Sequence, residues 1–235
     1  NLEIIKIKYS HEIIKYNRIF IMNQDMCNKL FKLCKLSKKQ IDYLNHKSNY
    51  EVYYFYNLNE LIKEKNTKIK NCKILFNKKI PPNSFPSSIE TIVFYNKYNK
   101  SFDIGTLPNN LNELTLGYHF NQILEPGVLP NSLTHLNFGE YYDQILEPGV
   151  LPHGLTHLTF NGSHNKPLKK DSLPKSLTHL TFNKTIDTQL KPHILPNNLT
   201  HLELSDFYDY PIEKGVFPES LTHLTFGGYL IYIEN

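Results

Sequence analysis

The sequence lacks residues and segments on which several protein classes depend. Its 235 residues include no alanine, no tryptophan and a single arginine, Arg18, against 25 lysines. Alanine is the best helix former, so its absence favours strands over helices. No stretch approaches the roughly 18 consecutive apolar residues that a membrane-spanning helix needs. We therefore expect no membrane span and no membrane partner.

Cysteine is also scarce. Cys27, Cys34 and Cys72 are too few and too scattered for a disulfide framework, and none forms a C-x-x-C pair. This pattern favours free thiols in a reducing compartment. The apolar N-terminal stretch is interrupted by Glu3 and Lys6, so we predict no signal peptide.

Motifs that carry catalysis are missing from the sequence. There is no glycine-rich phosphate loop, no nucleophile elbow and no H-E-x-x-H motif. The carboxylates are scattered rather than paired in a recurring pattern. We therefore predict no enzymatic activity, no catalytic residues, no cofactor and no metal.

The net charge of +4 hides two regions of opposite sign. Residues 1–80 hold 17 Lys or Arg and 7 Asp or Glu, whereas residues 81–235 hold 9 and 15. The differences are +10 and −6, which sum to +4. This break indicates two regions with different surfaces.

The most informative feature is an internal repeat. Seven prolines recur every 22 residues without any insertion: Pro86, Pro108, Pro130, Pro152, Pro174, Pro196 and Pro218. The segment Leu-Thr-His-Leu occurs five times, starting at Leu133, Leu155, Leu177, Leu199 and Leu221. A fixed period of this kind is the signature of a repeat architecture.

Each repeat contains one stretch in which apolar and polar residues alternate. The apolar positions lie six and eight residues after each proline, a spacing typical of a half-buried strand. One strand cannot bury its apolar face alone, whereas stacked coils bury a continuous core. We predict a mainly β solenoid of 22-residue coils over residues 67–235, with a parallel sheet and an extended or turn-rich convex side. The expected strand starts lie near 89, 111, 133, 155, 177, 199 and 221.

A second column of the repeat holds Asn or Asp. Such side chains can bond backbone groups that are exposed where each coil turns. Because the residue recurs in every copy, a structural ladder is favoured over a catalytic or glycosylated column. The predicted ladder comprises Asn99, Asn121, Asp143, Asn165, Asp187 and Asp209.

In the last five repeats a histidine lies five residues after the proline, between the apolar residues three and six after it, so it should project from the open face of the sheet. We predict that the partner-binding residues are these histidines and the polar column beside them: His135, His157, His179, His201, His223, Asn137, Thr159, Thr181, Glu203 and Thr225. Strands about 4.8 Å apart would stack the five imidazoles in a row.

Three interpretations of the histidine column compete. The first is a neutral stacked ladder that repeat duplication has copied. The second is a metal site, which is disfavoured because zinc needs three or four converging ligands and collinear histidines supply two. The third is a pH-sensitive recognition surface. Five charged imidazoles would repel one another, so acidification below about pH 6 is expected to loosen the repeats or change partner binding.

The repeat unit Leu-Pro-x-x-Leu-Thr-His-Leu-x-Phe, followed by Phe/Tyr-Asn/Asp-x-x-Leu/Ile, resembles the FNIP repeat. The clearest copies of the second part lie at 76–80, 120–124 and 208–212. FNIP repeats belong with leucine-rich repeats and are known from social amoebae and from giant viruses of amoebae. The resemblance implies a leucine-rich-repeat-like solenoid that is used for protein interactions and has no enzymatic activity.

Some members of this family carry an N-terminal F-box, which docks onto the adaptor of a cullin ubiquitin ligase. No Leu-Pro start precedes the apolar helical segments of residues 1–66, so we predict a small basic α/β cap there instead. Nucleic-acid binding through this region is disfavoured, because one arginine is available for bidentate contacts. The expected elements are a strand at 2–9, helices at 25–36 and 38–46, a strand or apolar link at 52–56 and a helix at 58–65.

These observations predict a protein–protein interaction scaffold that binds through the concave face of the sheet. The acidic repeat region favours a partner protein with a basic patch, a host protein if the source is viral. We expect a monomer located in the cytoplasm, which would be the host cytoplasm for a viral protein. Two alternatives stay open. One is a substrate receptor of a cullin-type ubiquitin ligase, with an F-box that is degenerate or lies upstream of Asn1. The other is nucleic-acid binding through the basic N-terminal region.

Overall fold

The structure is a computed structural model that describes residues 52–205, 207–227 and 229–232. These residues belong to one compact unit, Ser48–Asn235. The strand expected at 2–9, the helices expected at 25–36 and 38–46, and the cysteines Cys27 and Cys34 lie outside the described residues.

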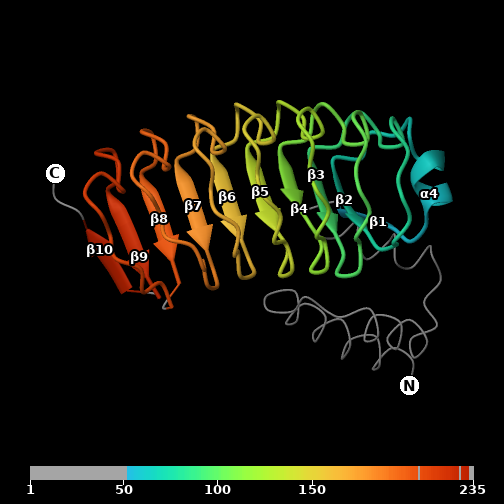
Figure 1. Ribbon diagram of the computed structural model, residues 1–235. Coiled ribbons are helices and arrows are strands. Elements are labelled where there is room, and N and C mark those ends of the chain that lie inside the picture. Colours follow the sequence, from blue (N-terminus) through green and yellow to red (C-terminus); the bar gives the residue numbers. More distant parts are fainter. Residues whose placement is uncertain (1–51, 206, 228, 233–235) are drawn as a thin grey trace, which may run out of the picture. The chain divides into compact units, whose positions relative to one another are not determined.

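The described residues form one ten-stranded sheet in which neighbours in the sequence are neighbours in space (Figure 1). All pairs from β1 to β9 are parallel, and β10 pairs with β9 in the antiparallel direction. The strands are β1 (Val52–Phe55), β2 (Asn71–Ile74), β3 (Thr91–Phe94), β4 (Glu113–Thr115), β5 (His135–Phe138), β6 (His157–Phe160), β7 (His179–Phe182), β8 (His201–Leu204), β9 (His223–Phe226) and β10 (Tyr229–Tyr232). The predicted parallel β solenoid is thus confirmed.

Each of the strands β3 to β9 begins two residues later than the expected starts near 89, 111, 133, 155, 177, 199 and 221. The reason is a tight turn that follows each repeat proline. The N–H of Leu133, for example, donates to the carbonyl of Pro130 at 3.1 Å. Leu133 is fully buried but belongs to this turn, and sheet pairing begins at His135.

The core is built from the columns that the repeat keeps apolar. In β5, β6 and β7 the second and fourth residues of each strand are buried, and the first and third are half-buried. The ring of Phe160 lies between Phe138 and Phe182, with centroids 5.1 and 5.0 Å away. The parallel register therefore turns one sequence column into one continuous stack of side chains.

Small polar side chains satisfy backbone carbonyls between successive coils. The hydroxyls of Ser132 and Ser176 donate to the carbonyls of Leu111 and Leu155, each at 2.6 Å, and Ser220 repeats the contact with Leu199 at 2.7 Å. These serines lie two residues after the repeat prolines. Their contacts explain why a small polar residue precedes the Leu-Thr-His-Leu segment in these coils.

The sheet begins at Val52, before the boundary at residue 67 that the repeat columns predict. Strand β1 pairs in parallel with β2, and the short helix α4 (Leu58–Lys63) follows it. The helix is capped at Asn57, whose side chain accepts from the N–H of Glu60, while Glu60 accepts from the N–H of Tyr56. This coil lacks the proline signature, which is why its sequence reads as part of the cap region.

Among residues 52–205, 207–227 and 229–232, no helix has both the length and the apolar character that crossing a bilayer requires.

Candidate functional site

The candidate site is the open face of the sheet from β4 to β9. It is formed by the first and third residues of each strand, which point away from the core. The structure brings together all ten predicted partner-binding residues there: His135, His157, His179, His201 and His223, and beside them Asn137, Thr159, Thr181, Glu203 and Thr225. We call the five imidazoles the histidine row. Each of them is half-buried.

The histidine row is a stack of nearly parallel rings. Successive ring centroids lie 4.1 to 4.2 Å apart, and the planes differ by 8 to 13°. The in-register pairing of identical residues on parallel strands produces this arrangement. The sheet thus holds five imidazoles in one orientation.

Each ring is anchored by the threonine that precedes it. The hydroxyls of Thr134, Thr156, Thr178, Thr200 and Thr222 lie 2.8 to 2.9 Å from Nδ1 of the following histidine. The same hydroxyls lie 3.1 to 3.2 Å from a carbonyl one coil earlier. A hydroxyl can donate one hydrogen and accept others. It can therefore donate to a bare Nδ1, or accept from Nδ1–H while donating to the carbonyl, so Nδ1 is satisfied in every protonation state.

Three members of the histidine row, His157, His179 and His201, resist protonation. Burial lowers the pKa of His157 to about 4, with a further contribution from the neighbouring rings. Burial and neighbouring histidines also lower the pKa values of His179 and His201. The unfolded chain, with pKa values near 6.5, binds more protons than the folded chain at acidic pH. The contribution of His157, His179 and His201 to stability is therefore complete above about pH 6.5 and is lost as the pH falls below it.

The geometry does not assemble a metal site. Across the residues that the structure describes, no three or more His, Cys, Asp or Glu side chains are grouped so that they could hold a metal ion. Stacked parallel rings direct their nitrogen lone pairs side by side, whereas zinc needs ligands that converge on one point.

The charges on this face are carboxylates. Glu113 on β4 pairs in register with His135, and Glu203 on β8 lies two residues after His201; both side chains are exposed. Strands β4 to β9 contribute no Lys or Arg. Beneath the row the core is apolar, formed by residues such as Leu158 and Leu180.

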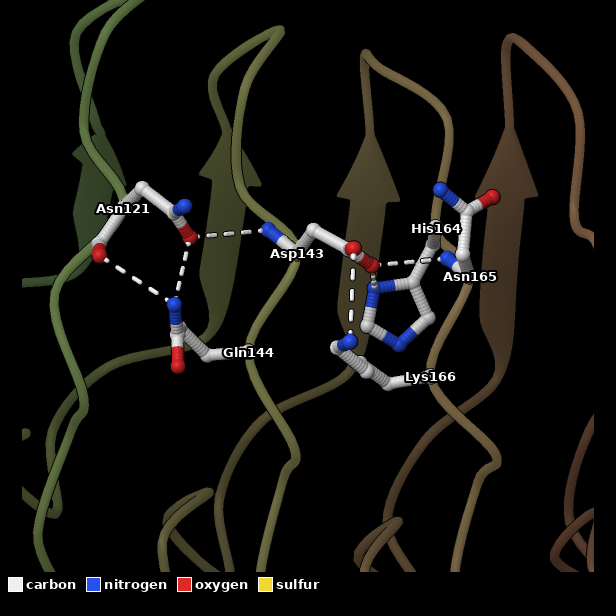
Figure 2. A network of polar contacts seen from close by, with 6 residues as sticks. All are labelled: Asn121, Asp143, Gln144, His164, Asn165 and Lys166. Carbon is white, nitrogen blue, oxygen red and sulfur yellow. Dashed lines mark hydrogen bonds and ion pairs between the residues drawn. The ribbon is translucent and has the colours of Figure 1, made fainter.

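The Asn/Asp column lies on the segments that follow the strands (Figure 2). In four successive coils the backbone N–H of the column residue donates to the side chain 22 residues earlier: Asn99 to Asn77, Asn121 to Asn99, Asp143 to Asn121 and Asn165 to Asp143, at 2.7 to 3.1 Å. Asp187 departs from this pattern, because its N–H donates to the carbonyl of His164. Asp209 occupies the same position one coil later.

Removing one member of this ladder should destabilise the fold. Oδ1 of Asn121 accepts from the N–H of Asp143 at 3.0 Å and from Nε2 of Gln144 at 2.9 Å. We expect Asn121→Ala to lower the free energy of unfolding by about 1–3 kcal/mol, because two part-buried donors lose their acceptor. Denaturant unfolding would measure the loss, with the exposed Asn131→Ala as the matched control. Equal stabilities of the two variants would contradict a structural role for the column.

One buried histidine was not among the predicted site residues. His164 occupies the column in which the preceding coils have Tyr98, Phe120 and Tyr142, so it reads as one more core ring. It is fully buried, and neither ring nitrogen makes a hydrogen bond. Figure 2 shows its Nδ1 facing Asp143, at 3.9 Å from Oδ1. Burial lowers the pKa of His164, so it adds to the acid sensitivity of the folded state.

An exposed aromatic cluster also carried no clear sequence signal. Tyr118 and Tyr141 meet edge to face at 5.1 Å, and His119 stacks on Tyr141 at 5.2 Å. Lys184 and Glu140 form an ion pair that spans two coils. These residues lie just after the strands, at positions where the repeat columns vary, so periodicity could not find them.

The repeat region matches a known protein family. The FNIP repeat model matches residues 76–119, 120–163, 142–185, 164–207 and 187–229. The chain belongs to the FNIP repeat family. Four of the matched segments begin at the aromatic-biased column that opens the second part of the repeat, and the last begins one residue later, at Asp187. Together they include strands β3 to β9.

This FNIP repeat chain is also similar to CroV588, an LRR-like protein of a giant virus, whose crystal structure is described as a novel circular LRR protein structure. The two are 43% identical, with a TM-score of 0.63, over 66% of this chain and 23% of CroV588. The chain thus spans about a quarter of the length of that relative. A search of curated proteins found no match.

Proposed function

We propose that this FNIP repeat chain is a non-catalytic binding scaffold that captures a protein partner on the open face of the sheet. The observation that supports the proposal is the in-register array of half-buried polar side chains on strands β5 to β9. Parallel strands and threonine anchors hold these side chains in place before a partner arrives. Preorganisation of this kind lowers the entropic cost of binding.

The charge of the repeat region indicates which partner the scaffold would favour. Residues 81–235 carry 9 Lys or Arg against 15 Asp or Glu. Glu113 and Glu203 place two of these carboxylates on the open face itself. Complementary charge speeds association and excludes partners of the same sign. The scaffold is therefore suited to a protein with a basic patch.

The proposal is tested by affinity capture with matched variants. Wild type is compared with His135/His157/His179→Ala and with His119/His153/His193→Ala, which removes three exposed histidines outside the row. We expect a partner that wild type and the control variant retain and the row variant loses, at least tenfold by quantitative mass spectrometry. A partner retained equally by all three would rule out the open face as its binding site. Circular dichroism would verify that each variant is folded.

A further inference from the structure

We propose that the histidine row holds a Lys- or Arg-bearing segment of the partner while its imidazoles are neutral, and releases it when they are protonated. This inference rests on the proposed function and adds the chemistry of the contact and its regulation. It follows from three observations on the open face: the use of the two ring nitrogens, the position of the carboxylates and the stacking of the rings.

The ring nitrogens have different surroundings. Nδ1 of each histidine contacts the preceding threonine hydroxyl, which also lies 3.1 to 3.2 Å from a carbonyl. When the hydroxyl donates to that carbonyl, it accepts from Nδ1–H. In this tautomer Nε2 carries the lone pair. The rings of His135, His157, His179 and His201 then present a line of hydrogen-bond acceptors, which suits the donor-only side chains of Lys and Arg.

The distance between the two exposed carboxylates indicates the length of the binding surface. Glu113 on β4 lies beside His135, the first imidazole of the row. Glu203 on β8 lies two residues after His201, the fourth imidazole. They are four strands apart, which is about 19 Å at the usual strand spacing. An extended segment of about six residues covers that length. Such a segment can place one cation at each carboxylate and further donors on the imidazoles between them.

Protonation acts on the same atom that would bind the partner. In this tautomer the added proton goes to Nε2, so proton and partner compete for one lone pair. The charge that appears also repels the bound ammonium or guanidinium. The facing charged groups are Glu113, Glu203 and the other imidazoles, with Lys73 two strands before Glu113 in the sheet. The core below the row is apolar, so nothing there neutralises the new charge.

The test measures binding of a defined basic probe at two pH values. A rhodamine-labelled 12-residue peptide of alternating lysine and serine is titrated by fluorescence anisotropy at pH 7.5 and pH 4.0, at constant ionic strength. The lower pH matches the pKa of about 4 of His157. The proteins are wild type, His157/His179→Gln and the matched control His119/His153→Gln. Glutamine keeps an acceptor but cannot be protonated in this range. We expect acidification to weaken binding at least threefold more for wild type and the control than for His157/His179→Gln.

Further variants test the role of the carboxylates and distinguish failure of this inference from failure of the proposed function. Glu113/Glu203→Gln should weaken binding at pH 7.5 at least fivefold, whereas Glu125/Glu147→Gln, with carboxylates on other segments, should not. Binding by wild type that is equal at both pH values would overturn the inference and leave the proposed function standing, as would an equal loss in His157/His179→Gln. No binding of the peptide at pH 7.5 would also overturn the inference, while the affinity capture decides the proposed function separately. Melting curves at both pH values would show that each protein stays folded.

Discussion

Phe160→Ala should lower the free energy of unfolding by about 3–5 kcal/mol, the usual cost of removing a fully buried ring. Phe160 is 1% exposed and lies between Phe138 and Phe182, with His164 at 4.5 Å from its centroid. In a solenoid each coil is stabilised mainly by its two neighbours. The cavity therefore weakens two interfaces at once, and the stability loss should be accompanied by reduced cooperativity.

Denaturant unfolding followed by circular dichroism would measure this effect. The matched control is Phe207→Ala, because Phe207 is 72% exposed and should change stability by less than about 0.5 kcal/mol. A loss below 1 kcal/mol for Phe160→Ala would mean that the phenylalanine column is not a continuous core.

Gly139→Ala is the second substitution with a large expected effect. A Cβ at Gly139 would lie 2.0 Å from the carbonyl oxygen of Gly117, and a Cβ at Gly117 would lie 2.4 Å from that of Tyr95. The obstructing atoms are backbone, so they cannot rotate away as a side chain would. We expect a loss of about 3 kcal/mol, at the upper end of the cost of overpacking.

A second glycine separates lack of space from backbone conformation. Gly149 has φ of +84°, with open space around the position of a Cβ. Gly149→Ala should therefore cost only the conformational strain of an L-residue, about 1–2 kcal/mol. Thermal and denaturant unfolding of the two variants would give their order. A smaller loss for Gly139→Ala than for Gly149→Ala would contradict the close approach of the coils.

Much of the fold could be predicted because the repeat has no insertions. When Leu136, Leu158 and Leu180 recur at a constant spacing, stacked coils are the arrangement that buries all of them together. The same reasoning placed the strands two residues too early. Apolar character marks Leu133 as buried, but only the hydrogen bond from its N–H to Pro130 assigns it to a turn.

The candidate site was predicted in part for the same reason. Five histidines at one position of the repeat had to lie in line on one face of the sheet. The anchoring by threonine was not predicted, because Thr134 and its equivalents precede the strand and their orientation depends on the turn. His164 was missed because it replaces an aromatic residue in a column that is otherwise core.

The order of residues along the chain determined the solenoid, its 22-residue coils and the histidine row, since periodicity alone dictates which side chains meet their equivalents. Only the tertiary structure decided how those side chains are used. The stacking of the imidazoles at 4.1 to 4.2 Å, the second contact of each threonine hydroxyl and the absence of space at Gly139 all depend on the distance between adjacent coils. The hydrogen bonds of the sheet and the packing of the core set that distance. The 22-residue spacing of the repeat does not predict it.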